Sequence, residues 1–211
     1  MVKDKKSKSF KILAAADIHG NSAVSESLAR KAEKEKVDLV ILAGDIHGFD
    51  ENRGIIAPFK KRNQKVIFVP GNWDTSFQTK ATKDFYKIKD IDGYYVHYDG
   101  VDIIGVGTKD FKMNLDEKKT LDRLIKNFEK VQNRPSRKVL VSHLHASGTL
   151  AEFSGIPGEE VLAKAIKYFQ PDVFIAGHIH EAEGLEHKVG KTKVIQVGKH
   201  GKIIEIKKKD D

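Results

Sequence analysis

Five short stretches of the chain share one layout, in which an apolar run ends in Asp, Asn or His. In the central stretch, Leu42 to Gly48, the apolar run ends at Gly44 and the carboxylate of Asp45 follows. The other four stretches supply these polar side chains: Asp17 and His19, then Asn72 and Asp74, then His143 and His145, and finally His178 and His180. Because carboxylate, amide and imidazole groups are metal ligands, their gathering at strand ends predicts a metal centre.

The ligand types narrow the choice of metal. Oxygen from Asp and Asn combined with nitrogen from His suits Mn, Fe, Zn, Co or Ni, whereas the histidines argue against Mg or Ca. The chain has no cysteine, which excludes a thiolate zinc site and a Cys nucleophile. We expect two divalent metal ions, with Mn favoured. Asp45 is the natural bridge because it falls between Asp17 and Asn72 in chain order.

Two pairs of candidate ligands are separated by a single residue. Asp17 and His19 form one pair, and His178 and His180 form the other. Since alternate residues of an extended segment face the same way, each pair is expected to reach one ion together.

Each of these features also has an interpretation without function. A single Asp after a strand is usually a turn former or a helix cap. His47 and His145 are either extra site residues or solvated loop histidines, and Trp73 is either core packing or an apolar wall beside the substrate. The ordered set of five stretches favours a functional site, but the sequence leaves the roles of these three residues open.

The segments that carry these residues alternate between strand and helix patterns. Strands are predicted at 10–16, 37–43 and 66–69, with a helix capped by Ser22 after the first and a short helical piece at 55–62 after the second. This order predicts parallel strands joined by right-handed crossovers. Their carboxyl ends meet at one edge, where open α/β sheets bind ligands.

The second half of the chain adds antiparallel pairing. Turn signals at Asp99-Gly100 and Gly190-Lys191 predict two hairpins. The remaining predicted elements are a helical or irregular segment at 75–87, helices at 115–131 and 158–169, and strands at 138–142, 172–176 and 202–206. The pattern is that of an α/β protein with mixed sheets.

The composition bounds the domain organisation. With 211 residues and 39% hydrophobic content, the chain suits one domain at 10–206, between a charged arm at 1–9 and a charged tail at 207–211. No apolar run approaches the roughly 20 residues of a membrane span, and no apolar segment follows the lysine-rich N-terminus. We therefore expect a cytoplasmic protein without a membrane partner.

The net charge of +8 raises the question of a nucleic-acid partner. Much of this charge lies in the N-terminal arm, and lysines at a chain end are more often solvated than part of a binding surface. Because a nuclease needs a basic groove, the sequence supports nucleic acid only weakly. It does not indicate an oligomeric state.

The order of the motifs resembles the calcineurin-like metallophosphoesterase superfamily, and especially its small single-domain phosphoesterases of archaea and bacteria. The resemblance extends from Phe10 to about Ile206 and rests on Asp-x-His, Gly-Asp, Gly-Asn-x-Asp, an isolated His after a strand, and Gly-His-x-His. It implies a four-layer α/β/β/α sandwich with two mixed sheets. It also implies these ligands: Asp17, His19, Asp45 and His180 for the first metal, and Asp45, Asn72, His143 and His178 for the second.

The same resemblance implies a phosphoric ester hydrolase. In such a site a hydroxide bridging two ions roughly 3.5–4 Å apart attacks phosphorus in line. Asp74 is expected to hold Asn72 in place.

Two residues depart from the family pattern. Trp73 stands where the commonest members have a histidine that contacts the phosphate or the leaving group, and some phosphodiesterase members lack that histidine too. His145 stands where related small members often have proline, and it is the nearest candidate to donate the missing proton. The favoured function is therefore a phosphodiesterase for small or nucleotide-like phosphodiesters. The alternatives are a nuclease and a non-catalytic scaffold.

Overall fold

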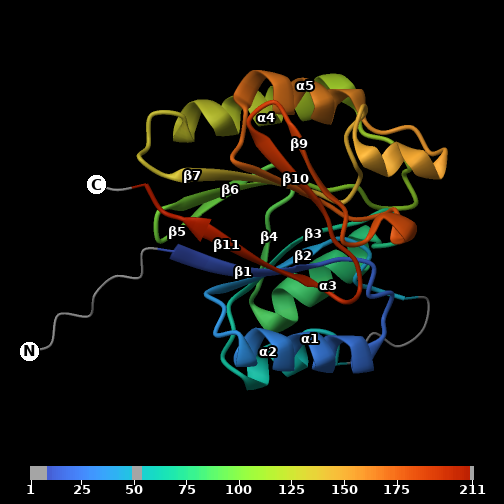
Figure 1. Ribbon diagram of the computed structural model, residues 1–211. Helices are drawn as coiled ribbons and strands as arrows, with labels where there is room; N and C mark the ends of the chain where they lie inside the picture. The colour runs from blue at the N-terminus through green and yellow to red at the C-terminus, as the bar shows by residue number, and fades with distance from the viewer. Residues whose placement is uncertain (1–8, 49–53, 210–211) are drawn as a thin grey trace, which may run out of the picture.

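The computed structural model describes residues 9–48 and 54–209, which form four layers (Figure 1). Two mixed sheets lie face to face. Helices α4 (Glu117–Val131) and α5 (Glu160–Phe169) cover one sheet, and α1 (Ser22–Lys34) and α2 (Ala57–Lys61) cover the other. The predicted four-layer α/β/β/α sandwich is confirmed. Within the predicted arm and tail, residues 1–8 and 210–211 lie outside the described part of the chain.

The first sheet has the strand order β11-β1-β2-β3-β4. Its members are β1 (Ser9–Ala15), β2 (Leu39–Ala43), β3 (Val66–Val69), β4 (Lys89–Asp90) and β11 (Lys202–Lys207). Strands β1 to β4 run parallel, and β11 pairs antiparallel with β1. The parallel strands predicted for the first half of the chain are therefore present.

The second sheet has the order β5-β6-β7-β8-β10-β9. Its members are β5 (Tyr95–Tyr98), β6 (Val101–Val106), β7 (Arg137–Ser142), β8 (Val173–Ala176), β9 (Glu186–Val189) and β10 (Thr192–Gln196). Both predicted hairpins form, since β5 pairs antiparallel with β6 and β9 with β10.

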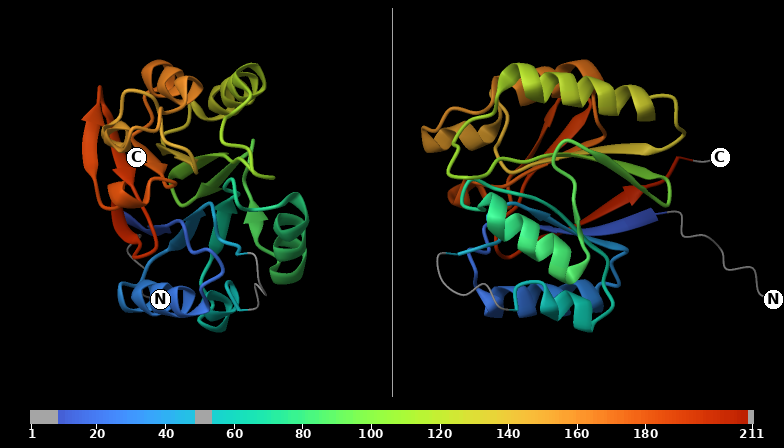
Figure 2. Two further views of the ribbon diagram at one scale, coloured as in Figure 1. Left: turned by 90° about the vertical axis from the view of Figure 1, so that its right-hand side faces the viewer. Right: turned by 180° about the vertical axis from the view of Figure 1, so that it is seen from behind.

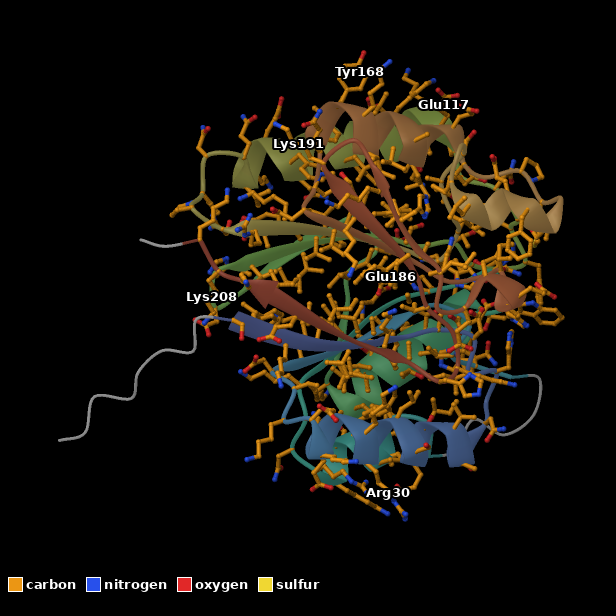
Figure 3. All side chains as sticks on the ribbon, viewed as in Figure 1. Arg30, Glu117, Tyr168, Glu186, Lys191 and Lys208 are labelled. Atoms are coloured by element: carbon orange, nitrogen blue, oxygen red, sulfur yellow. The ribbon has the colours of Figure 1, made fainter. Side chains whose placement is uncertain are left out.

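The core follows from the alternation of side chains along the strands. In β1, Ile12 and Ala14 pack between the two sheets, while Leu13 and Ala15 face the helices of the first sheet. Because both faces of each sheet are covered, these strands are apolar on both sides, as their continuous hydrophobic runs predicted. The outer helix surfaces are polar, and Figure 3 shows Arg30 on α1 and Tyr168 on α5 pointing away from the sheets.

The helix starts differ from the prediction: α2, α4 and α5 each begin two residues later than predicted, and the cap of α1 is a different residue. Asn21, and not Ser22, caps α1, because its side-chain oxygen accepts hydrogen bonds from the backbone N–H groups of Ala23 and Val24, both at 3.1 Å. Helix α3 (Ser76–Tyr86) begins with a capping box formed by Thr75 and lies beside the edge strand β4 (Figure 2).

Three elements have no counterpart among the predictions: β4 and the two short 3-10 helices η1 (Leu150–Ser154) and η2 (His180–Ala182). All three are too short to show a hydrophobic period. Among the described residues, no helix is long and apolar enough to span a membrane.

Candidate metal centre

Five parallel strands from both sheets end at the same edge of the molecule. This edge lies on the right-hand side of Figure 1 and faces the viewer in the left panel of Figure 2. Strands β1, β2 and β3 of the first sheet lead into Asp17, His19, Asp45 and Asn72. Strands β7 and β8 of the second sheet lead into His143, His178 and His180. The candidate ligands are thus divided between two sheets that meet at this edge.

The first cluster contains Asp17, His19 and His180, whose ligand atoms all lie within 4.8 Å of one another. The Nε2 atoms of His19 and His180 are 3.4 Å apart, and His180 Nε2 is 3.5 Å from Asp17 Oδ1. Asp17 Oδ1 is buried and has no hydrogen-bond partner. A buried carboxylate oxygen without a donor fits a position that a cation fills.

The second cluster contains Asp45, His143 and His178 within the same distance. Asn72 joins it, because its Oδ1 is 2.9 Å from His143 Nε2. His143 donates its Nδ1 hydrogen to the carbonyl of Ala43 at 2.9 Å, which leaves Nε2 as the ligand atom. The lone pairs of an amide oxygen, a carboxylate and an imidazole therefore converge, which fits a borderline divalent ion.

Asp45 touches both clusters. Its Oδ2 is 3.2 Å from His143 Nε2 in the second cluster and 3.9 Å from His19 Nε2 in the first. Its other oxygen, Oδ1, accepts a hydrogen bond from the backbone N–H of Trp73 at 2.9 Å. This geometry suits the bridging position predicted from the chain order.

The electrostatics of the site favour added positive charge. Burial alone would lower the pKa of His143, but the carboxylate of Asp45 outweighs it and raises this pKa to about 9. Burial, together with the charge of the neighbouring His143, lowers the pKa of His178 to about 4. His178 is therefore neutral near pH 7, with a lone pair available for a metal ion.

The ligand loops are not extended, so the argument from strand alternation is wrong. Asp17, His19, Asp45 and His178 have φ values of 57°, 47°, 51° and 71°, in the left-handed region that non-glycine residues seldom adopt. The turns still bring Asp17 and His19 into one cluster. They separate His178 from His180, which lie in different clusters as the family resemblance implied. Such strained positions are typical of functional sites.

Two glycines allow the loops to approach each other. A Cβ at Gly44 would lie 2.4 Å from His143 Nδ1, and a Cβ at Gly71 would lie 2.1 Å from Asp45 Oδ1. Both contacts are shorter than any real Cβ contact, so a side chain at either glycine would displace a candidate ligand.

Asp74 and His47 support the ligand loops from behind. Asp74 is fully buried and accepts hydrogen bonds from the backbone N–H groups of Gly71 at 2.7 Å and His47 at 2.9 Å. It therefore orients Asn72 through the adjacent peptide, without a direct side-chain contact. The His47 ring lies between Asp74 Oδ1 and Thr82 Oγ1, each at 2.7 Å. Since His47 is buried, its interpretation as a solvated loop histidine is wrong.

His145 is also buried, and it contacts the loop that follows η1. Its Nε2 donates to the carbonyl of Ile156 at 3.2 Å, and its ring stacks on that of His178 with centroids 6.4 Å apart. Its Nδ1 is buried and has no hydrogen-bond partner. Burial lowers the pKa of His145. The interpretation as a solvated histidine is therefore wrong here too.

A profile of the calcineurin-like phosphoesterases (Metallophos) matches residues 10–182, a span that contains all seven candidate ligands. The chain belongs to this family. Family membership and the two clusters together support a dinuclear divalent metal site and a phosphoric ester hydrolase. No curated protein gives a significant match to the sequence.

Solved structures share the phosphoesterase fold. The protein TT1561 of Thermus thermophilus has a TM-score of 0.70 at 15% identity, covering 90% of each chain. A dimetal phosphatase from Danio rerio has a TM-score of 0.62 at 14% identity, covering 96% of this chain and 93% of its own. An archaeal phosphodiesterase has a TM-score of 0.54 at 21% identity, covering 90% and 84%. At these identities the likeness shows the fold alone.

Beside the phosphoesterase site lies an aromatic pair, of which the sequence pointed to only one member. Trp73 is 40% exposed, and its ring meets His19 edge-on at a centroid distance of 6.0 Å. Phe111 meets Trp73 in the same way at 6.0 Å. Phe111 belongs to a segment without a motif or a hydrophobic period, so no sequence signal identified it.

A cavity of about 410 Å³ opens on the other side of the first cluster. Its lining includes Asp17, His19 and His180, together with Lys199 and His200 from the turn after β10. No sequence signal identified Lys199 and His200, because they form a polar turn in the sequence and come beside the ligands through the pairing of β10 with β8.

Proposed function

We propose that this phosphoesterase hydrolyses small or nucleotide-like phosphodiesters with two divalent ions, of which Mn is favoured. The observation that carries the proposal is the pair of ligand clusters that share Asp45, with Trp73 at the rim in place of a proton-donating histidine. A diester attacked at phosphorus expels an alkoxide or an aryl oxide, and the latter departs without a general acid. The site therefore suits diesters with good leaving groups.

Some residues of the site would hold the metal ions, and others position the loops that carry the ligands. Two divalent ions held here would supply a nucleophile at neutral pH and polarise the phosphoryl oxygens. Asp17, His19 and His180 would hold one ion, and Asn72, His143 and His178 would hold the other, with Asp45 available to both. Asp74 and His47 keep the loops in register, because Asp74 bonds the backbone of two of them.

The deciding experiment measures hydrolysis of bis(para-nitrophenyl) phosphate and para-nitrophenyl phosphate with Mn added. We expect metal-dependent turnover with a higher kcat/KM for the diester, and loss of turnover after chelation. A higher kcat/KM for the monoester would overturn the diester preference. No turnover of either compound, with two equivalents of metal bound, would support the non-catalytic scaffold.

The same assay tests the nuclease alternative, which the net charge of +8 raises. A nuclease would cleave an oligonucleotide faster than the small diester, and its binding would weaken steeply with salt. We expect the small diester to be the better substrate.

His145 is proposed to position the site and not to donate the proton. The carbonyl of Ile156 can only accept, so the nitrogen bonded to it carries the hydrogen, and that hydrogen is already used. The ring thereby ties the loop after η1 to the second cluster through its stacking on His178.

We expect His145→Ala to slow alkyl and nitrophenyl phosphodiesters by the same factor, roughly 10–100-fold, as for loss of an outer-shell partner of a metal site. The measurement compares kcat on both substrates at equal metal content. Selective slowing of the alkyl diester would instead identify His145 as the proton donor.

A further inference from the structure

The aromatic pair at the rim of the metal centre, Trp73 and Phe111, is unusually exposed for large aromatic side chains. Trp73 is 40% exposed and Phe111 is 58% exposed, although large aromatic side chains gain most by burial. The pair lies edge to face with an interplanar angle of 79°, and Trp73 in turn meets the ligand His19 at 87°. An exposed aromatic surface in contact with a metal ligand marks a place where an apolar part of a ligand can lie.

Phe111 is held beside the site by the metal loop itself. Its backbone N–H donates to the carbonyl of Asn72 at 2.8 Å, and the N–H of Asp110 donates to the carbonyl of Asp74 at 3.1 Å. The Asp110 carboxylate accepts from the N–H of Ser76 at 2.7 Å and from its hydroxyl at 2.5 Å. Four hydrogen bonds therefore fasten this short segment to the loop that carries Trp73.

The backbone at this point is strained. Asp110 and Phe111 both have positive φ values, 57° and 60°. A bulky residue such as Phe rarely adopts this conformation, and two in succession are costly. The strain places the Phe111 ring against Trp73, which indicates that the position of the ring matters.

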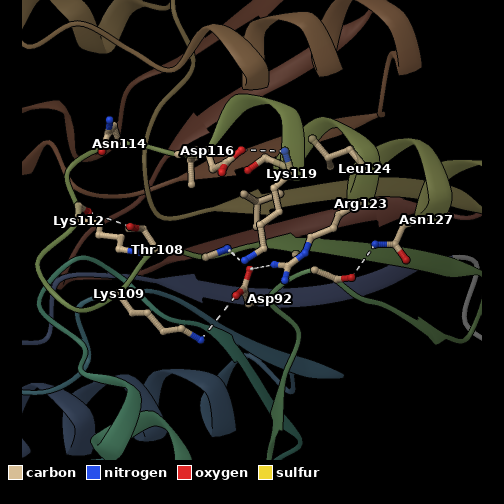
Figure 4. Close-up of a pocket in the computed structure, with 16 residues that line it drawn as sticks. Asp92, Thr108, Lys109, Lys112, Asn114, Asp116, Lys119, Arg123, Leu124 and Asn127 are labelled. Carbon is tan, nitrogen blue, oxygen red and sulfur yellow. Dashed lines mark hydrogen bonds and ion pairs between the residues drawn. The ribbon is translucent and has the colours of Figure 1, made fainter.

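The other side of the same segment is anchored to Asp92, in the loop between β4 and β5, as Figure 4 shows. Asp92 accepts a hydrogen bond from the N–H of Gly107 at 3.0 Å and forms ion pairs with Lys109 at 3.9 Å and Arg123 at 3.8 Å. Since residues 107–111 are fixed at both ends, the aromatic surface is formed before any ligand binds, which lowers the entropy cost of binding.

We propose that Trp73 and Phe111 form a recognition surface for a planar aromatic ring of the substrate, and that this ring is a nucleobase. The proposal rests on the proposed phosphodiesterase function and names its substrate class as nucleotide esters. Stacking of a base on aromatic side chains tolerates every base, because each has a π-face. The phosphoester then lies over the metal ligands while the base lies against the Trp73–Phe111 surface.

The chain provides its own reporter for this contact. It contains a single tryptophan, so its tryptophan fluorescence comes from Trp73 alone. The experiment titrates the full chain with adenosine monophosphate, phenyl phosphate and ribose phosphate. Adenosine monophosphate and phenyl phosphate should change the fluorescence at much lower concentrations than ribose phosphate does. Tighter binding of adenosine monophosphate than of phenyl phosphate identifies a nucleobase. The reverse order would overturn the nucleotide assignment, and equal affinity for all three would overturn the surface as a whole.

Variants locate the contact. Phe111→Ala should weaken binding of adenosine monophosphate by about 10-fold, within the range for loss of one stacking partner, and leave ribose phosphate unchanged. Phe111→Tyr should retain the affinity, which controls for folding. Phe85→Ala removes a still more exposed aromatic ring, 77% exposed, at the C-terminal end of α3 and should have no effect. Unchanged affinity in Phe111→Ala would overturn the proposal.

The experiments distinguish the phosphodiesterase activity from the Trp73–Phe111 recognition surface. If adenosine monophosphate binds at Trp73 but no phosphodiester is hydrolysed, the recognition surface stands and the proposed activity falls. If phosphodiesters are hydrolysed without any preference for an aromatic ring in binding, the activity stands and the recognition surface falls.

Discussion

The Asp45→Ala variant should lose both metal ions and nearly all hydrolytic activity. Asp45 is the candidate ligand whose carboxylate lies within 4 Å of a histidine ring nitrogen in each cluster, whereas Asp17 reaches the second cluster only through the backbone N–H of His178. Removing it takes a negative charge from a site that is built to attract cations, and it also removes the acceptor for the N–H of Trp73. The rate should fall by more than the roughly 10–100-fold that loss of an outer-shell partner costs.

Metal analysis of matched variants provides the control for Asp45. Asp17 lies in the first cluster alone and Asn72 in the second alone. The variants Asp17→Ala and Asn72→Ala should therefore each keep one equivalent of metal. Asp45→Ala should keep none. Two equivalents bound to Asp45→Ala would show that this carboxylate does not bridge, and circular dichroism would exclude unfolding as the cause of a loss.

Trp73→His should raise kcat on alkyl phosphodiesters by up to about 10²-fold and change kcat on nitrophenyl phosphodiesters little. General-acid catalysis contributes about 10²–10⁴ in rate, and an indole N–H does not titrate near neutral pH. An alkoxide needs that proton in the transition state, whereas a nitrophenoxide does not. The backbone N–H at position 73 still donates to Asp45 in the variant, so the metal loop is kept.

Trp73→Phe is the matched variant, since it keeps an aromatic ring and supplies no proton. Its kcat on alkyl phosphodiesters should stay at the wild-type level. The comparison uses kcat because loss of stacking would also change KM. An equal rise of both substrates in Trp73→His would show that relief of steric hindrance, and not proton donation, causes the effect.

The strands and the types of the candidate ligands could be predicted because both leave local signals. Buried parallel strands give continuous apolar runs, and each run here ends in a ligand residue. The conformation of the ligand loops left no such signal. The positive φ values of Asp17 and His178 follow from the packing of the loops against neighbouring strands, which alternation along an isolated strand does not represent.

Contacts between segments that are distant in the sequence could not be predicted either. His47 and His145 follow short polar motifs, which are typical of solvated loops, but both are buried and form hydrogen bonds with Thr82 and Ile156, which lie 35 and 11 residues away. Phe111 is held beside Trp73 by hydrogen bonds between segments more than 30 residues apart, from its own N–H to Asn72 and between Asp110 and Ser76. The sequence shows no pattern from which such pairs could be inferred without the tertiary structure.

The division of the ligands between two sheets has a consequence for how the protein is made. The first sheet holds Asp17, Asp45 and Asn72, yet its edge strand β11 comes last in sequence among the described strands. During synthesis β1, β2 and β3 are made first, the histidines that follow β7 and β8 are made next, and β11, which pairs with β1, is made after them. Because each cluster takes ligands from both sheets, neither is complete until the two sheets have docked, and a metal ion bound at either cluster would stabilise the docked state.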